Sequence, residues 1–176
     1  MADQDLRYPI GKFTREQNLT AAKRTALIQQ IAETPGSLRA ALTGLNEQQL
    51  DTPYRPDGWT VRQVAHHVPD SHLNAYIRFK LAVTEEAPTI KTYQEKLWAE
   101  LDDAKTAPIE ISLQLLEALH HRWVKFLQSL QPADFARQLN HPAHGLMKVD
   151  DLLQLYAWHG RHHVAHITSL RQRMGW

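Results

Sequence analysis

The chain has 176 residues, of which 43% are hydrophobic and 22% are charged, as is typical of a soluble globular protein. This length suits one domain with a substantial hydrophobic core, so we expect residues 1–176 to form a single domain. The 20 basic and 19 acidic side chains give a net charge of +1. Such a balance gives no electrostatic reason to expect a nucleic-acid partner.

The chain contains no cysteine. Disulfides and thiolate metal sites are therefore excluded, and any transition metal would be bound by nitrogen and oxygen atoms. The N-terminal residues lack a basic segment followed by an apolar run, and nowhere do about 18 apolar residues follow one another. We therefore expect a cytoplasmic protein that is neither secreted nor inserted in a membrane.

The first 45 residues predict an arm followed by helix. Residues 1–15 carry Pro9 and Gly11 and show no helical period, which predicts an extended arm laid on the body. Residues 16–34 have apolar side chains at the three- and four-residue spacing of an amphipathic helix. Pro35 and Gly36 are expected to kink or interrupt it before residues 37–45 resume the pattern.

The middle of the chain predicts a loop, a long helix and a short helix. Residues 51–59 form a loop by their prolines and Asp-Gly pair. Thr60 and Gln63 have the spacing of a capping box, so a helix should run from residue 60 to about Thr84. Pro69 is expected to kink it. Residues 93–103 predict a short helix.

The remaining residues predict two more long helices. The helical period is clear over residues 111–130, and residues 132–149 are interpreted as an irregular connection. Asp150 or Asp151 can cap the last helix, which should continue to Met174. No segment alternates long enough to predict a strand. Four long helices with short additions predict an all-α four-helix bundle.

Four of the eleven histidines fall in the stretch YAWHGRHHVAHI, residues 156–167. Because a helical residue advances by about 100°, positions three, four and seven apart share one face. His159, His163 and His166 fall on a single seam with apolar residues at both ends, so they should point into the bundle. His162 falls at the edge of the seam. The full seam is Leu152, Tyr156, His159, His163, His166 and Leu170.

Several buried imidazoles are unfavourable together unless their nitrogens find partners. A metal ion supplies a partner, and histidines at positions i and i+4 can present nitrogens to one ion. His159 and His163 have this spacing, and so do His162 and His166. A histidine cluster that responds to pH is the alternative interpretation.

A further ligand should come from a facing helix, and residues 60–84 offer one. His67 falls near the margin of the apolar face, whereas His66 points to the opposite side. The geometry favours His67, while His72 stays possible. A single histidine on a helix is more often a hydrogen-bonded core or surface residue than a ligand. We apply that interpretation to His66, His72, His120, His121, His141 and His144.

Several separated segments resemble one family. These are RYPIGKF near the start, GWTVRQV followed by HHVPDSH, the middle segment RFKLAVTEEAPTIKTYQEKLWAELDD, WHGRHH, and the ending SLRQRMGW. Together they resemble the YfiT branch of the DinB-like superfamily over nearly the whole chain. The resemblance implies a cytoplasmic four-helix bundle, commonly a homodimer, with one divalent ion, Zn²⁺ or Ni²⁺, held by three histidines.

The resemblance also assigns the ligands. The second histidine of the pair after GWT is His67, the histidine after Trp158 is His159, and the second histidine of the next pair is His163. Family members are described as metal-dependent hydrolases, and related members act as thiol transferases that use a low-molecular-weight thiol such as bacillithiol. The implied partner is thus a small-molecule substrate, with no nucleic acid and no membrane.

Three neutral imidazoles would leave a bound ion with its full charge and at least one open position. Such an ion lowers the pKa of bound water to about 7, or binds and deprotonates a thiol. Nearby candidates for a catalytic role are Asp70, three residues after His67, and His166, one turn after His163. Tyr156 and Trp158 are candidates to line the pocket, although aromatic side chains on bundle helices are commonly core residues.

Three functions therefore compete. The first is a metal-dependent hydrolase that activates water, and the second is a metal-dependent thiol S-transferase. The third, of another class, is a metal-binding or stress-associated protein without catalysis, which predicts an ion with no open position. The sequence alone does not separate hydrolysis from thiol transfer.

Overall fold

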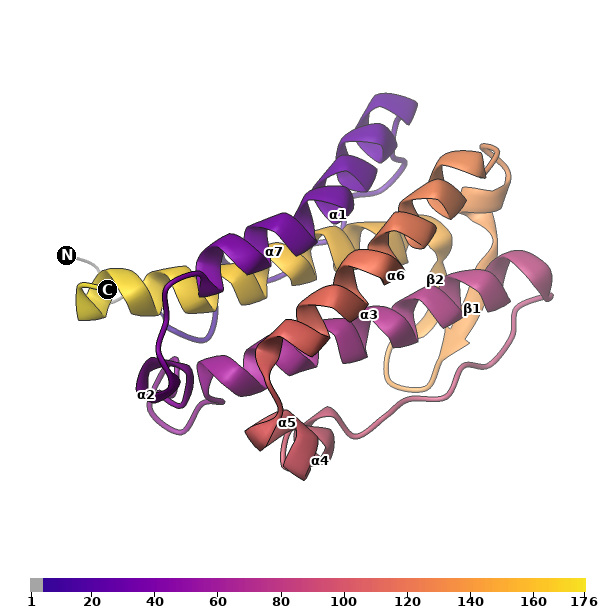
Figure 1. The fold of residues 1–176 in the computed structure, drawn as a ribbon. Helices are drawn as coiled ribbons and strands as arrows, with labels where there is room; N and C mark the ends of the chain where they lie inside the picture. Colours follow the sequence, from indigo (N-terminus) through magenta and orange to yellow (C-terminus); the bar gives the residue numbers. More distant parts are fainter. Residues whose placement is uncertain (1–4) are drawn as a thin grey trace.

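The computed structural model describes residues 5–176, and the fold is mostly helical (Figure 1). Four long helices account for most of it, with short helices and a two-stranded hairpin between them. In chain order the elements are α1 (Ala21–Leu42), α2 (Glu47–Leu50), α3 (Val61–Thr84), α4 (Glu95–Trp98), α5 (Asp102–Thr106), α6 (Ile109–Ser129), the 3₁₀ helix η1 (Asp134–Ala136), β1 (Gln138–His141), β2 (Gly145–Lys148) and α7 (Val149–Met174). The predicted four-helix bundle is therefore confirmed.

Helices α1 and α7 lie side by side and run in the same direction (Figure 1). Near their N-terminal ends, Arg24 Nε and Nη2 donate to the Asp150 carboxylate at 2.8 and 2.7 Å. Near their C-terminal ends, Arg171 Nη1 donates to the carbonyl of Ala41 at 2.8 Å. Contacts thus follow the same order along both helices, which makes the pair parallel.

Helices α3 and α6 form the second parallel pair, running opposite to the first (Figure 1). His66 hydrogen-bonds Ser112, and six residues further along His72 hydrogen-bonds His120. Each pair packs against the other, with α3 next to α7 and α1 next to α6. A residue early in α3 therefore faces a residue late in α7, which sets which histidines can meet.

Two apolar clusters occupy the two ends of the bundle, and most of the buried histidines lie between them. The first cluster centres on Trp123 and Phe79 and includes Ile31, Leu127, Leu139, Leu152 and Leu153. The second includes Leu38, Val61, Val64, Val68, Leu116 and Ile167. The intervening level of α3, α6 and α7 carries the buried His67, His72, His120 and His163 and the half-buried His159. We call these five residues the histidine layer.

The connection between α6 and α7 contains an antiparallel hairpin, so the prediction of an irregular segment without strands was wrong. In β1 and β2, Leu139 pairs with Met147, and both side chains are buried against the first apolar cluster. Each strand has only four residues and buries one large apolar side chain. Alternation this short gives no recognisable period.

Neither helical proline interrupts its helix. Helix α1 continues through Pro35 from Ala21 to Leu42, and α3 continues through Pro69 from Val61 to Thr84. The expected interruption after residue 34 was therefore wrong, whereas a kink at Pro35 or at Pro69 stays a prediction. A proline within a helix removes the hydrogen bond to the carbonyl four residues earlier and crowds that carbonyl. The carbonyl freed by Pro35 has another partner, described below.

Other element boundaries also differ from those expected. The short helix expected over residues 93–103 is two helices, α4 and α5, separated by a turn. The N-cap of α7 is Lys148 rather than an aspartate, because Asp151 Oδ2 accepts the Lys148 backbone N–H at 2.8 Å from inside the first turn. Gly175 ends α7 in the left-handed conformation, at φ 71°.

Residues 5–15 form the described part of the expected arm, and residues 1–4 lie outside the described residues. The segment has no helix and lies along α7. The carbonyl of Arg7 accepts from His166 Nε2 at 3.2 Å, and Arg15 Nη1 donates to Asp151 at 3.0 Å. The arm therefore covers part of the histidine-bearing face of α7.

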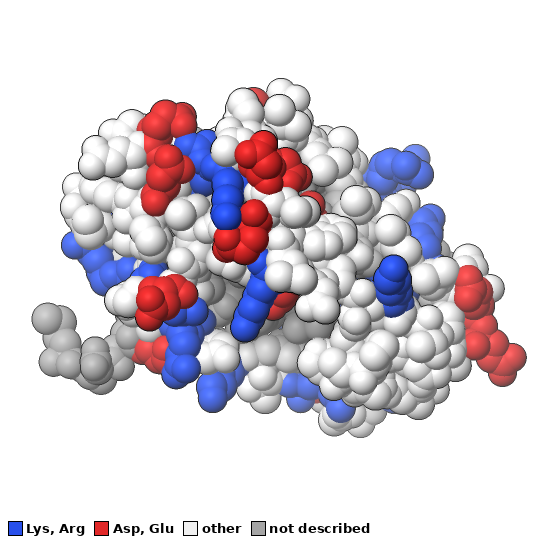
Figure 2. All heavy atoms as spheres, turned by 90° about the horizontal axis from the view of Figure 1, so that it is seen from below, with Lys and Arg blue, Asp and Glu red and all other residues white. Residues whose placement is uncertain are grey.

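The surface shows mixed charge. On the face drawn in Figure 2, Lys and Arg side chains are interspersed with Asp and Glu side chains, with no large area of a single sign. Within residues 5–176, no helix has the length and apolar character needed to cross a membrane.

The close approach of α1 and α7 yields a stability prediction. A Cβ added at Gly160 would lie 2.6 Å from Oγ1 and 2.7 Å from Cγ2 of Thr34, whose β-branched side chain has little rotamer freedom. We expect Gly160→Ala to lower the free energy of unfolding by about 1–3 kcal/mol. Chemical denaturation of metal-free protein measures it. Gly36→Ala is the matched control, because its Cβ would meet nothing within 4 Å.

The control should gain up to about 1 kcal/mol, as alanine is the better helix former. Adding Thr34→Ala to Gly160→Ala should restore part of the loss. If Gly160→Ala and Gly36→Ala were equally stable, the clash between the added Cβ and Thr34 would cost nothing, and this explanation would be wrong.

Candidate metal centre

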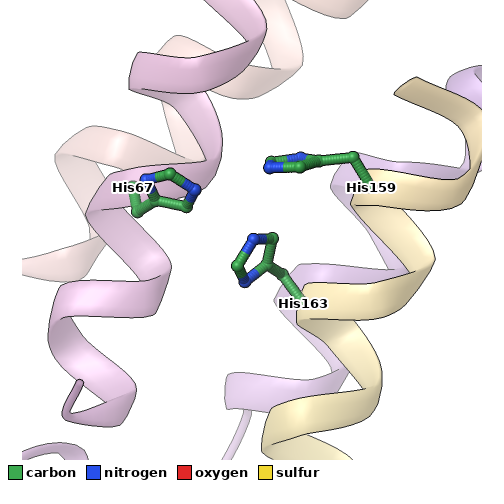
Figure 3. A group of neighbouring side chains, drawn as sticks. All are labelled: His67, His159 and His163. Carbon is green, nitrogen blue, oxygen red and sulfur yellow. The ribbon is translucent and has the colours of Figure 1, made fainter. Parts of the chain in front are cut away.

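Three histidines on two helices converge between the apolar clusters (Figure 3). His67 lies on α3, and His159 and His163 lie one turn apart on α7. Each offers one ring nitrogen such that all three nitrogens lie within 4.8 Å of one another. The antiparallel packing of α3 against α7 places His67 opposite the other two, with ring centroids 5.4 Å from His159 and 4.7 Å from His163.

Burial keeps these imidazoles neutral. It lowers the pKa of His67 to about 4, with a smaller contribution from His166, and it holds the pKa of His159 and His163 well below the usual value. Neighbouring histidines lower both latter values further. A neutral imidazole keeps one unprotonated nitrogen, which is the form that binds metals.

A chain of hydrogen bonds runs from His159 across the bundle to α1. His159 Nδ1 lies 3.1 Å from His72 Nε2, and His72 Nδ1 lies 2.8 Å from His120 Nε2. His120 Nδ1 lies 2.8 Å from the carbonyl oxygen of Ile31. The chain thus connects α7, α3, α6 and α1 at one level.

The carbonyl at the end fixes the direction of every bond in this chain. A carbonyl oxygen only accepts, so His120 Nδ1 must donate, and its other nitrogen must accept because the ring is neutral. Burial lowers the pKa of His120 to about 4 and of His72 well below its usual value, so the same reasoning passes to the next ring. His72 therefore donates through Nδ1 and accepts at Nε2 the Nδ1–H of His159. The Nε2 of His159 is left as its unprotonated nitrogen.

Pro35 explains why the Ile31 carbonyl is available. Proline has no N–H, so the carbonyl four residues before it, that of Ile31, lacks its usual partner within α1. His120 Nδ1 supplies the missing hydrogen bond. The proline that interrupts the sequence pattern of the first helix is thus the origin of the histidine chain.

His166 lies beside the three-histidine cluster without joining it. Its ring stacks on Tyr54 with centroids 4.0 Å apart, and its Nε2 donates to the Arg7 carbonyl in the N-terminal arm. Burial lowers its pKa to about 4. Among the described residues no hydrogen bond joins His166 to His163, so its catalytic role stays a prediction.

Asp70 also lies outside the cluster. It is half-buried, and burial, helped by the carboxylate of Asp103 on α5, raises its pKa to about 6. A carboxyl group with a pKa near neutrality is suited to general acid or base catalysis. No described contact joins Asp70 to the three histidines, so this role too stays a prediction.

The other histidines near the centre have structural contacts. His66 points away from the cluster, as predicted, and hydrogen-bonds Ser112 Oγ at 2.7 Å and the Ala107 carbonyl at 3.1 Å. His162 stacks on Trp158, with ring centroids 4.3 Å apart. His72, considered as an alternative ligand, uses both ring nitrogens in the hydrogen-bond chain.

A cavity of about 490 Å³ borders the cluster on the side of His159. Ser71 and Tyr156 form its wall near His159, and Ser71 Oγ lies 3.4 Å from His159 Nε2. The expectation that Tyr156 lines a pocket fits this position, whereas Trp158 packs against His162. The three histidines fit a divalent metal ion by their neutral nitrogen donors and their convergence beside a space for a small molecule.

The fold and this site define a class of four-helix bundles with a candidate metal centre between facing helices. Residues 30–167 match the model of the DinB superfamily, and the chain belongs to that family. It resembles YfiT from Bacillus subtilis, whose structure is described as "a probable metal-dependent hydrolase with an unusual four-helix bundle topology". The two chains share 48% identity and a TM-score of 0.95, with coverage of 97% of this chain and 98% of YfiT.

Sequence relatives have a similar description. A protein of Bacillus mycoides is 56% identical over 98% of this chain and 99% of its own length, and a protein of Bacillus cereus has the same identity and coverage. Both are named "Putative metal-dependent hydrolase".

The buried histidines predict a loss of stability in acid. The pKa of His67, His120, His162 and His166 is about 4 in the folded protein, chiefly through burial, against a usual 6.5. Between pH 4 and pH 6.5 these histidines bind protons in the unfolded chain but not in the folded protein. Their full contribution to the free energy of unfolding is therefore present above about pH 6.5 and is lost as the pH drops toward 4. Each group contributes up to about 1.4 kcal/mol per pH unit. Urea denaturation of metal-free protein at several pH values measures the slope, and a flat profile from pH 7 to 5 would contradict it.

Proposed function

We propose that this protein is a metal-dependent hydrolase in which His67, His159 and His163 hold one divalent ion, Zn²⁺ or Ni²⁺. The convergence of three neutral ring nitrogens within 4.8 Å carries the proposal. Imidazole nitrogen suits both ions, and three protein ligands are typical of catalytic rather than structural zinc sites. The descriptions of the relatives point to the same class of reaction.

The ion, when bound, would supply Lewis acidity to a water molecule or to a substrate oxygen. The residues of the protein orient the metal ligands and give the substrate access to the site. The hydrogen-bond chain from Ile31 orients His159 and keeps its Nε2 unprotonated, and the cavity beside it admits a small-molecule substrate. Burial of His67 and His163 limits the access of bulk water to the site.

The metal site is tested by elemental analysis of protein purified without a metal-affinity tag. We expect about one Zn²⁺ or Ni²⁺ per chain in the wild type and its loss in His163→Ala, because two remaining histidines hold an ion weakly. His121→Ala is the matched control, as His121 is exposed on α6. A wild-type protein that neither contains nor takes up either ion would refute the site.

Hydrolysis is tested by activity of metal-loaded and chelated protein on panels of small esters, amides and phosphoesters. We expect turnover with metal and none without it. The same preparations receive a small thiol with an electrophile, because the same open ion would activate a thiol. Turnover only in the thiol panel would replace the hydrolase proposal by thiol transfer, and tight metal binding without any turnover would favour a non-catalytic role.

The histidine chain yields a prediction on metal affinity. His72→Phe removes the acceptor of the His159 Nδ1–H, so His159 loses its fixed orientation and tautomer. We expect the dissociation constant for Zn²⁺ to rise about 10- to 100-fold, the range seen when such outer hydrogen bonds are removed. Competition with a chromophoric chelator measures it.

His66→Phe is the matched control. His66 is a buried histidine on the same helix, but its hydrogen-bond partners are Ser112 on α6 and the carbonyl of Ala107, not a residue of the metal centre. It should bind Zn²⁺ as the wild type does. Nitrogen-15 NMR of the ring of His159 gives a second readout, with loss of the single tautomer expected only in His72→Phe. Unchanged affinity and tautomer in that variant would exclude an orienting role for His72.

A further inference from the structure

Arg78 is a buried arginine on α3 with unsatisfied donors. It is 8% exposed. Its Nη1 donates to Tyr156 Oη at 3.1 Å, and its Nη2 lies at the limit of hydrogen bonding, 3.5 Å, from the Lys91 carbonyl. Its Nε is buried without a hydrogen-bond partner. The two donors on this side of the guanidinium, Nε and Nη2, therefore have no strong hydrogen-bond partner in the protein.

No carboxylate neutralises this charge. None of the ion pairs found within residues 5–176 includes Arg78. Arg62, also buried on α3, differs in pairing with both Asp51 and Glu47. A buried guanidinium without a counter-charge is costly to the folded protein. Retaining one at such a position is understandable if an anion binds there.

The cavity beside the metal centre connects Arg78 with His159. Both residues line it, and Tyr156, which accepts from Arg78, precedes His159 by about one helical turn on α7. The ring centroids of Tyr156 and His159 are 5.7 Å apart. Glu95 also lines the cavity, but it is exposed and forms no ion pair with Arg78. One small molecule can therefore reach both Arg78 and the metal centre.

We propose that Arg78 binds a carboxylate group of the substrate while the metal centre acts on another part of the same molecule. The binding of a carboxylate by Arg78 deepens the proposed function, and the action of the metal centre on the same molecule rests on that function. The substrate class is a small carboxylic acid whose reactive group lies a few bonds from the carboxylate. Arg78 is a binding residue that selects and orients this substrate.

The chemistry of the free donors favours a carboxylate. Nε and one Nη of an arginine form a planar fork that matches the two oxygens of a carboxylate. A singly charged group also balances the single charge of the guanidinium, because the other two charged residues of the cavity wall, Glu95 and Lys96, offset each other. The cavity of about 490 Å³ is large enough for a metabolite-sized molecule.

The first test needs no bound metal and no variant. Protein labelled with nitrogen-15 at arginine is titrated with propionate, with 1-propanol as the uncharged control, and the Nε–H resonance of Arg78 is followed by NMR. We expect a saturable shift with propionate alone, both with and without Zn²⁺. The exposed Arg122 on α6 serves as the internal control and should not shift.

The second test measures selectivity at the loaded centre. Co²⁺-substituted protein is titrated with 3-mercaptopropionate and with 3-mercapto-1-propanol, whose sulfur gives a charge-transfer band when it binds cobalt. We expect the carboxylate compound to bind about 10- to 100-fold more tightly, the effect of a charge-assisted hydrogen-bonded pair. Arg78→Met should abolish this preference and leave the cobalt content unchanged, and Arg122→Met should retain the preference.

The outcomes separate the two proposals. No response of Arg78 to propionate, or equal affinity of the two thiols in wild-type protein, would overturn the carboxylate site even if the metal centre is real. A protein that takes up no cobalt would overturn the metal centre, while the propionate titration would still decide whether Arg78 binds a carboxylate. Folding of Arg78→Met is checked by its unfolding midpoint, and the wild-type comparisons stand without that variant.

Discussion

The arrangement of the bundle depends on one constraint, the burial of a histidine layer between two apolar clusters. Each neutral imidazole has one hydrogen-bond donor and one acceptor. A buried donor or acceptor without a partner destabilises the folded protein. The carbonyl of Ile31 starts a chain in which every donor of His120, His72 and His159 meets an acceptor. The unprotonated nitrogen left at the end is the one beside His67 and His163 that a metal ion would satisfy.

The directions of the helices allow this hydrogen-bond chain to form. Parallel packing of α3 with α6 brings His72 to His120, and antiparallel packing of α3 with α7 brings His72 to His159. Pro35 completes the chain, because a helix without it would use the Ile31 carbonyl internally. Helix packing and ligand orientation are therefore two aspects of one hydrogen-bond network.

The sequence predicted the helices and the convergent histidines better than the connections between them. His159 and His163 are recognisable because their spacing and apolar flanks depend on one helix alone, and Thr60 with Gln63 marks the start of α3 through a local capping box. The role of His120 depends on the relative rotation of two helices, which periodicity does not specify. The hairpin at Leu139 and Met147 is too short for its alternation to stand out. Arg78 had one signal, its position on the face of α3 shared by Ala75 and Ala82, but charge on an apolar face does not by itself indicate a ligand.

The histidine layer also relates stability to function. Imidazoles held neutral in the interior make the stability of the metal-free protein dependent on pH, since burial, helped by neighbouring histidines, keeps their pKa low. An ion that binds only the folded chain stabilises it in proportion to the logarithm of its free concentration over the dissociation constant. The same reasoning applies to Arg78, whose uncompensated charge is a cost until an anion arrives. Neutral ligands leave the charge of the ion undiminished, so the metal end and the arginine end of the cavity would both attract the same negatively charged molecule.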